Sequence, residues 1–134
     1  MLNRKQSREA VFGLVYELDF NREYEVDEIY HNALELREIE ENEYIKETFF
    51  GIYVNIAEID SLIEEKSRGW KMDRISKVSR AAMRLCAYEI KYTEIPFNIA
   101  INEALEIVKK YDDEKARGFV NGILNSIAEE CKKK

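Results

Sequence analysis

The chain is poor in the residues that interrupt regular secondary structure. Its 134 residues include one proline and five glycines, so few positions break a helix or form a tight turn. This scarcity favours long helices over many short strands. Long apolar stretches are also missing, since no run approaches the roughly 18–20 residues that a membrane-spanning helix needs. The first residues carry charges where a signal peptide has its apolar segment, so we expect no membrane association.

Residue types that support catalysis or metal binding are scarce as well. Cys86 and Cys131 are the only cysteines and form no CxxC pair, and the single histidine, His31, lies in an acidic segment. A reduced cytoplasmic protein is the simplest interpretation. We recognise no nucleophile with a base, no metal-ligand cluster and no glycine-rich cofactor loop. The expectation is therefore a protein that is not an enzyme and needs no cofactor or metal.

Helical periodicity fills most of the chain. In residues 44–65, apolar side chains recur at steps of three and four and lie on one helical stripe: Ile45, Phe49, Ile52, Ile56, Ile59 and Ile63. Similar patterns predict helices over residues 4–20, 25–38, 74–92 and 97–111, and a last helix that begins near residue 113. With a hydrophobic content of 46%, the chain can bury a core. We expect one all-α domain spanning residues 1–134.

The stretch FVNGILNSI, residues 119–127, contains an Asn-Gly pair, which is a strong hairpin signal. Its apolar residues, however, fall at intervals of one and three, which is a helical period, so we predict a helix. Gly122 inside that helix costs about 1 kcal/mol relative to alanine. Two explanations for Gly118 and Gly122 remain open, namely close packing of a neighbouring helix and a surface that faces a ligand.

Charge is distributed unevenly, although the formal net charge is −6. Residues 23–43 carry nine acidic groups against Arg37, whereas residues 66–84 carry seven basic groups against Asp73. We interpret Arg84, which lies in an apolar run, as a buried arginine paired with a helix carboxylate such as Glu89 or Glu103. The pattern suggests a molecule with one acidic and one basic face. A solvated charged surface is the alternative explanation.

Basic residues occur together with aromatic residues in several places. Arg4 and Arg8 share a helix face beside Lys5. Lys71, Arg74 and Lys77 recur at steps of three, and Lys115 and Arg117 flank the start of the last helix. Tyr16 and Phe119 are aromatic and offer a stacking surface beside such charges. Phosphates bind cations and bases stack on aromatic rings, so this composition favours single-stranded RNA as a ligand.

Four stretches together resemble the NusB family of bacterial transcription factors. They are REAVFGLVYELD, ISKVSRAAMRLCAYEI, IPFNIAINEALEIVKKY and FVNGILNSI, and their order and spacing also fit. The resemblance covers nearly the whole chain. It implies an all-α fold of six to seven helices in two packed halves of about three helices each. It also implies that Asn121 and Gly122 sit near a helix start, where a missing Cβ lets a neighbouring backbone come close.

The resemblance further implies partners and site residues. Members of the family bind boxA RNA together with the ribosomal protein NusE, in the antitermination complex with RNA polymerase that supports ribosomal RNA synthesis. Positions matching the family's RNA surface are Arg4, Lys5, Arg8, Lys115, Arg117 and Phe119. Tyr16 and an exposed region near Ser79 match the part that receives NusE. Gln6 departs from the pattern, because relatives can carry a basic residue there.

Two other functions remain as alternatives. A helical protein–protein adaptor without significant RNA affinity would be consistent with the net charge and with Gln6. NusB-like domains also occur fused to RNA-modifying methyltransferases, but this chain ends after its last predicted helix, so we expect no methyl-donor domain. A homodimer that hides the RNA surface is left open by the sequence.

Overall fold

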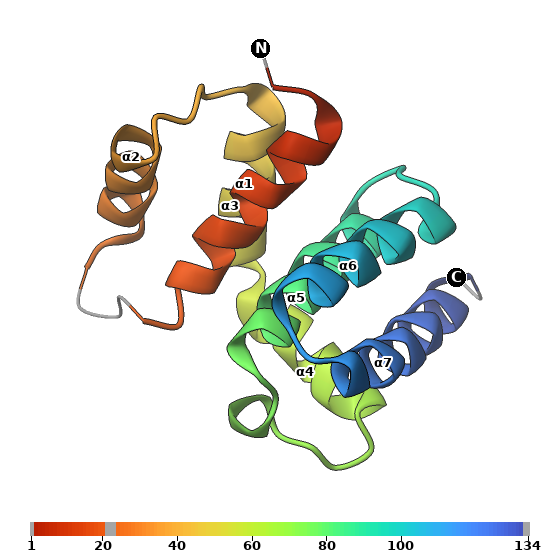
Figure 1. The fold of residues 1–134 in the computed structure, drawn as a ribbon. Coiled ribbons are helices and arrows are strands. Elements are labelled where there is room, and N and C mark those ends of the chain that lie inside the picture. The colour runs from red at the N-terminus through yellow and green to blue at the C-terminus, as the bar shows by residue number, and fades with distance from the viewer. Residues whose placement is uncertain (1, 21–23, 133–134) are drawn as a thin grey trace.

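A computed structural model describes residues 2–20 and 24–132. Within these ranges the chain is all-α, as expected, and contains no strand (Figure 1). The helices are α1 (Arg4–Glu17), α2 (Val26–Leu36), α3 (Glu43–Val54), α4 (Ile56–Lys66), the short 3-10 helix η1 (Met72–Arg74), α5 (Lys77–Tyr92), α6 (Phe97–Tyr111) and α7 (Glu114–Lys132).

Helix α1 begins with a capping box. The side chain of Asn3 accepts a hydrogen bond from the backbone N–H of Gln6 at 2.8 Å, and the Gln6 side chain accepts one from the N–H of Asn3 at 2.9 Å. This exchange satisfies two of the backbone donors that a helix start leaves unpaired. Gln6 therefore has a structural function at the position where the family pattern allows a basic residue.

The continuous helix predicted over residues 44–65 is wrong in one respect, because it is divided at Asn55. The Asn55 backbone adopts φ −104° and ψ 14°, and its side-chain amide donates to the carbonyl oxygen of Gly51 at 2.8 Å. A side chain that bonds to a nearby carbonyl in this way competes with the helix ladder. The apolar stripe nevertheless continues across the break, since Ile52 and Ile59 are both fully buried.

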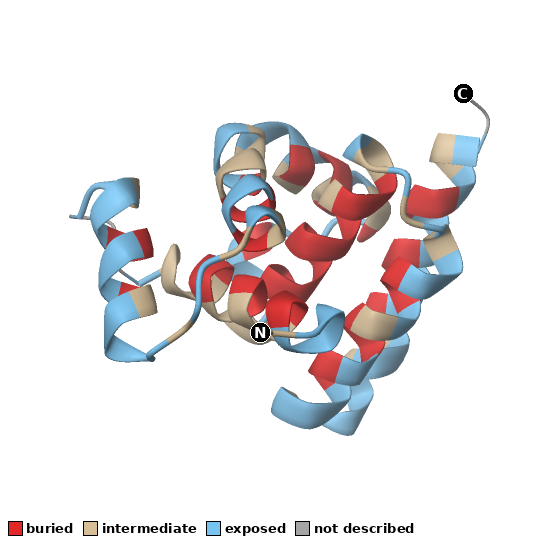
Figure 2. Cartoon of the chain, turned by 90° about the horizontal axis from the view of Figure 1, so that it is seen from above, coloured by how far each residue is buried: buried red, intermediate tan, exposed pale blue. Residues whose placement is uncertain are grey.

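Helix α5 lies at the centre of the molecule and packs against α1, α3, α4, α6 and α7. Residues 79–87 are all buried (Figure 2). Helix α2 stands at the edge beside α1 and is mostly exposed, with Tyr30 stacked on Phe49 of α3 at a ring-centroid distance of 5.6 Å. The acidic segment around α2 thus lies at the opposite end of the molecule from α6 and α7 (Figure 1).

Buried charge links α5 to α4 and to the segment that follows α1. Arg84 is buried as predicted, but its partners are Asp60 of α4 and Asp19, not Glu89 or Glu103. Burial disfavours the charged form of Arg84, yet these carboxylates outweigh that cost and raise its pKa above the ordinary value. The sequence pattern identified the burial of Arg84, whereas its partners depend on how the helices pack.

Across residues 2–20 and 24–132, no helix combines the length and the apolar character that crossing a bilayer demands.

Candidate nucleic-acid and partner interface

Arg4 and Lys5 are exposed in the first turn of α1, and that turn contains no acidic residue. Basic side chains at a helix start oppose the helix macrodipole, so these two residues do not stabilise the helix electrostatically. They combine with the unpaired backbone N–H groups of the same turn to make this end of α1 attractive to anions.

Arg8 does not belong to that exposed group. Its side chain is 2% exposed, and its Nε lies 3.2 Å from a carboxylate oxygen of the buried Glu89, which also accepts a hydrogen bond from Tyr44 at 2.8 Å. Burial disfavours the charged guanidinium, but Glu89 outweighs this effect and raises the pKa of Arg8. The sequence predicts that Arg8 contacts RNA from the same helix face as Arg4. In the structure, Arg8 is buried and pairs with the carboxylate of Glu89 on α5.

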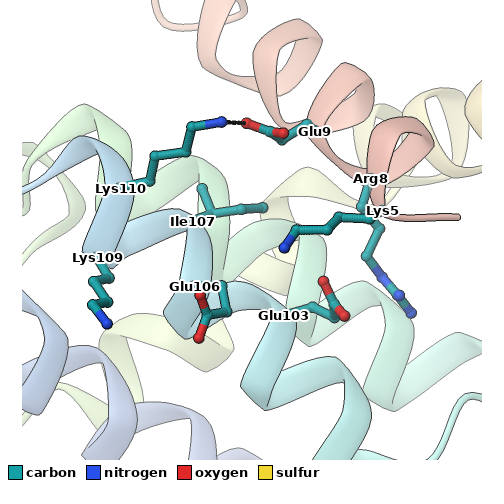
Figure 3. Close-up of a pocket in the computed structure, with 8 residues that line it drawn as sticks. All are labelled: Lys5, Arg8, Glu9, Glu103, Glu106, Ile107, Lys109 and Lys110. Carbon is teal, nitrogen blue, oxygen red and sulfur yellow. Dashed lines mark hydrogen bonds and ion pairs between the residues drawn. The ribbon is translucent and has the colours of Figure 1, made fainter. Parts of the chain in front are cut away.

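Lys5 and Arg8 both line a hollow of about 430 Å³ between α1 and α6 (Figure 3). The remaining lining residues come from α1 and α6, and all except the apolar Ile107 are charged, with both signs present: Glu9, Glu103, Glu106, Ile107, Lys109 and Lys110. Glu9 bridges the two helices by accepting hydrogen bonds from Lys110 at 2.8 Å and from Tyr111 at 2.6 Å, which lower its pKa. Lys109 and Lys110 were not among the predicted site residues, although their place in the last turn of a predicted helix was a signal.

The start of α7 exposes Lys115 and Arg117, as expected for cations that meet a ligand. Phe119 is half-buried, and its ring meets the ring of Trp70 edge-on at 5.9 Å. A Cβ added at Gly118 or Gly122 would meet no atom within 4 Å. Close approach of a neighbouring backbone, one of the two explanations left open for these glycines, is therefore wrong, because the helix face that carries them is open. The other explanation, a surface that faces a ligand, stays a prediction.

The exposed basic residues at positions that match the family's RNA surface form two separate groups. Arg4 and Lys5 lie at the start of α1 and Lys115 and Arg117 at the start of α7, with α6 between these helices (Figure 1). Lys109 and Lys110, in the last turn of α6, line the same hollow as Lys5 and come shortly before the start of α7 in the chain. A ligand that contacts both groups must be extended.

Tyr16 belongs to an aromatic surface on the outer side of α1. Its ring lies 6.1 Å from Phe12 and 4.9 Å from Phe20, and Phe12 stacks on Tyr111 of α6 at 5.5 Å. Beside these rings is a hollow of about 460 Å³ that Val78 and Arg37 also line. Phe20 and Tyr111 are about half exposed, and Lys77 lies over the ring of Phe20, 5.0 Å from its centroid.

Ser79 is not exposed as predicted. It is 2% exposed, and its hydroxyl donates to a carboxylate oxygen of Asp112 at 2.8 Å, while Ser76 donates to the same oxygen. Burial raises the pKa of Asp112, but these hydrogen bonds outweigh it and hold the pKa below its ordinary value. Ser79 therefore anchors the end of α6 to the start of α5, and Val78 faces the hollow in its place.

Among the described residues, no group of three His, Cys, Asp or Glu side chains is placed to hold a metal ion. Burial raises the pKa of the Cys86 thiol well above its ordinary value, which makes it a poor nucleophile. What the exposed surface offers is cationic and aromatic contact, which serves binding.

Comparison with known proteins places this surface in context. The model of the NusB family matches residues 5–129. The "Transcription antitermination protein NusB" of Acetivibrio thermocellus is 42% identical over 129 residues, covering 94% of this chain and 88% of the relative. The protein of the same name from Listeria monocytogenes is 38% identical over 132 residues, covering 98% and 100%.

Solved structures agree with the sequence relationship. A chain in a crystal structure of the antitermination factors NusB and NusE in complex with dsRNA superimposes with a TM-score of 0.84 at 32% identity, covering 95% of this chain and 96% of the other. Thermotoga maritima NusB gives 0.84 at 34% identity, covering 96% and 92%. Relatives of this name are transcription antitermination factors and not enzymes. The chain belongs to the NusB family of transcription antitermination factors.

Proposed function

We propose that the protein binds the single-stranded boxA element of nascent transcripts together with NusE, and thereby joins the antitermination complex on RNA polymerase that supports ribosomal RNA synthesis. The observation that carries this proposal is the likeness, over 95% of the chain, to a protein solved with NusE and RNA. Family membership supports the class of function, and the surface of this chain supports the assignment of residues.

On the RNA side, four exposed cations supply the phosphate contacts: Arg4, Lys5, Lys115 and Arg117. Their separation by α6 suits an extended strand, because single-stranded RNA can follow a surface and present phosphates at several points. Phe119 offers an aromatic edge beside the second group. Arg8 acts indirectly, because its ion pair with Glu89 holds the start of α1 against α5.

On the protein side, the aromatic surface around Tyr16 receives NusE. Tyr16, Phe20 and Tyr111 present rings beside a hollow, and aromatic residues of this kind anchor protein interfaces. Ser79 lies beneath this surface and shapes it through Asp112 without contacting the partner. The two contact surfaces share α1, so RNA and NusE can bind at the same time on neighbouring faces.

The test is binding of the full chain to a labelled single-stranded boxA RNA, with and without NusE, against a scrambled RNA of equal length. Selective binding that tightens when NusE is present is the expected result. Tyr16→Ala should remove that tightening and leave the affinity for boxA RNA alone unchanged. Lys46→Ala, in an exposed part of α3, serves as the control for nonspecific effects of substitution.

An adaptor without RNA affinity gives a different result. It would bind NusE and show no preference for boxA over the scrambled RNA in either condition. That outcome would contradict the proposal and turn the cations at the starts of α1 and α7 into ordinary surface residues.

A further inference from the structure

We propose that Trp70 is a stacking platform for a base of single-stranded RNA, and that Arg68, Lys71 and Arg74 bind the phosphates on either side of that base. These four residues are called the Trp70 platform below. The inference rests on the proposed RNA-binding function and extends its contact surface to a loop outside the positions that match the family's RNA surface.

Exposure of Trp70 is the first observation. Its side chain is 52% exposed and lines a hollow of about 410 Å³ that the other three platform residues and Gly69 complete. The indole is a large apolar group, and leaving half of it in water forgoes much of the stabilisation that burial would bring. Its placement at a hollow lined by cations is understandable if a ligand covers it.

The loop that carries Trp70 is held in place. Ser67 is buried, and its hydroxyl donates to the carbonyl oxygen of Trp70 at 2.6 Å. The backbone N–H of Met72, on the other side, donates to the carboxylate of Glu64 at 2.7 Å. Gly69 has φ +97°, a region that glycine adopts without strain. The loop therefore holds Trp70 at the surface before any ligand binds, which reduces the conformational entropy that the protein loses on binding.

Charge identifies the ligand as an anion. Residues 68–74 contain three exposed basic side chains and one acidic side chain, Asp73. The platform also adjoins the start of α7, because the Trp70 ring meets Phe119 at 5.9 Å. Lys115 and Arg117 extend the positive surface from there.

Two kinds of anionic polymer fit such a surface, and the aromatic ring separates them. An acidic peptide would satisfy the cations, but its acidic side chains carry no ring, and it covers the indole only where an aromatic residue happens to fall at the right place. A nucleotide strand offers phosphates to the cations and a π-face to the ring at the spacing of one nucleotide, so it satisfies both. The geometry favours RNA.

The experiment exploits the fact that Trp70 is the only tryptophan of the chain. Its fluorescence is recorded while the full-length protein is titrated with a single-stranded RNA that carries boxA and unpaired nucleotides on both sides. Anisotropy of a label on the RNA reports binding in the same titration. Quenching of Trp70 in parallel with the anisotropy rise is the expected result, because a stacked base quenches the indole directly.

Variants distinguish stacking from charge. Trp70→Ala should weaken binding about 5- to 150-fold, the range for loss of one stacked base, whereas Trp70→Phe should recover most of the affinity because it keeps a π-face. Arg68→Ala combined with Arg74→Ala should weaken binding and lower its salt dependence while the protein stays folded. Lys46→Ala should change neither binding nor quenching.

Three results would overturn the inference, and they differ in what they say about the proposed function. An anisotropy rise without quenching, with Trp70→Ala binding as tightly as the parent, would refute the platform and leave RNA binding intact. Equal quenching and competition by poly-glutamate would identify an acidic protein segment as the ligand. Absence of any anisotropy change would refute the platform together with the proposed function.

Discussion

Arg8 and Arg4 are four residues apart on one helix, yet their environments are opposite. Arg4 is exposed, whereas Arg8 is 2% exposed and depends on Glu89, which is itself 1% exposed. One guanidinium nitrogen of Arg8, Nη2, is buried without a hydrogen-bond partner among the described residues, so the pair is not fully satisfied. A buried ion pair of this kind adds little to the free energy of unfolding, but removing one of its two partners is costly.

Arg8→Ala should therefore lower the free energy of unfolding by about 3–5 kcal/mol, because Glu89 would remain buried without its cation. Arg4→Ala should change it by less than about 0.5 kcal/mol, as is usual at an exposed position. Urea unfolding of the two variants measures the difference. A loss below about 1 kcal/mol for Arg8→Ala would mean that the carboxylate finds another partner or takes up a proton.

Glycine positions provide a second contrast between residues. A Cβ at Gly122 would meet no atom within 4 Å, whereas at Gly51 it would overlap the hydroxyl oxygen of Tyr88 and lie 2.6 Å from its ring carbon Cζ. Gly122→Ala should raise the free energy of unfolding by about 0.5–1 kcal/mol through helix propensity. Gly51→Ala should lower it by about 1–3 kcal/mol, since the Tyr88 ring must move.

The variant Gly122→Ala also tests what the open face of α7 is for. If Gly122→Ala stabilises the protein and RNA affinity stays the same, the glycine is neither a packing nor a ligand position. A fall in RNA affinity with the stability gain retained would assign the glycine to the ligand surface. Thermal unfolding and RNA titration of the same preparation give both answers, and a destabilised Gly122→Ala would contradict the open environment.

At the scale of elements, the end of α6 and the start of α5 are joined by Asp112. Its carboxylate accepts hydrogen bonds from Ser76 and Ser79 at the start of α5, where the helix dipole also favours a negative charge. Because the folded-state pKa of Asp112 is lowered, its contribution is fully present above the unfolded pKa of about 4 and is lost as pH falls through the folded value.

Asp112→Asn should therefore cost about 1–2 kcal/mol of unfolding free energy at neutral pH, the range for hydrogen bonds to a charged group in a partly exposed place. The difference from the parent should shrink as pH is lowered below about 4, since the parent then loses the charge as well. Urea unfolding over that pH range measures it. A difference that is independent of pH would show that the ionised carboxylate is not what joins the two helices.

At the scale of the whole molecule, a negative protein meets a negative ligand. The net charge of −6 predicts repulsion, but the acidic segment around α2 lies at one end and the exposed cations lie at the starts of α1 and α7. Screening in salt acts over about 8–10 Å, so a strand on the cationic side is influenced mainly by the charges near it. The local arrangement of charged residues, more than the net charge, therefore decides whether the RNA is attracted or repelled.

Affinity for boxA RNA should consequently fall as salt rises, with a log–log slope of roughly 0.7 for each phosphate neutralised. Arg4→Ala combined with Lys5→Ala should reduce that slope by roughly 1.4 and weaken binding at low salt. Lys46→Ala combined with Lys132→Ala removes the same charge elsewhere and should leave the slope unchanged. Equal slopes for the two double variants would remove the start of α1 from the RNA surface.

Much of this molecule could be predicted from local pattern. Apolar spacing predicted the all-α class and most helices to within a few residues, because periodicity depends only on which side of a helix faces the core. Exposure of Arg4, Lys5, Lys115 and Arg117 was also predictable, since these residues lie off the apolar stripes. The motifs that resemble the NusB family indicated the relationship that the comparisons confirm.

Tertiary structure alone decided how the segments meet. Arg8 and Glu89 are 81 residues apart in the chain, and only the packing of α1 on α5 makes them partners. Likewise, Asp112 draws Ser79 inward, and Trp70 becomes part of a cationic surface because its loop reaches α7. Periodicity specifies which face of a helix is buried, whereas the pairing of charges and the composition of a surface depend on neighbours that are distant in sequence.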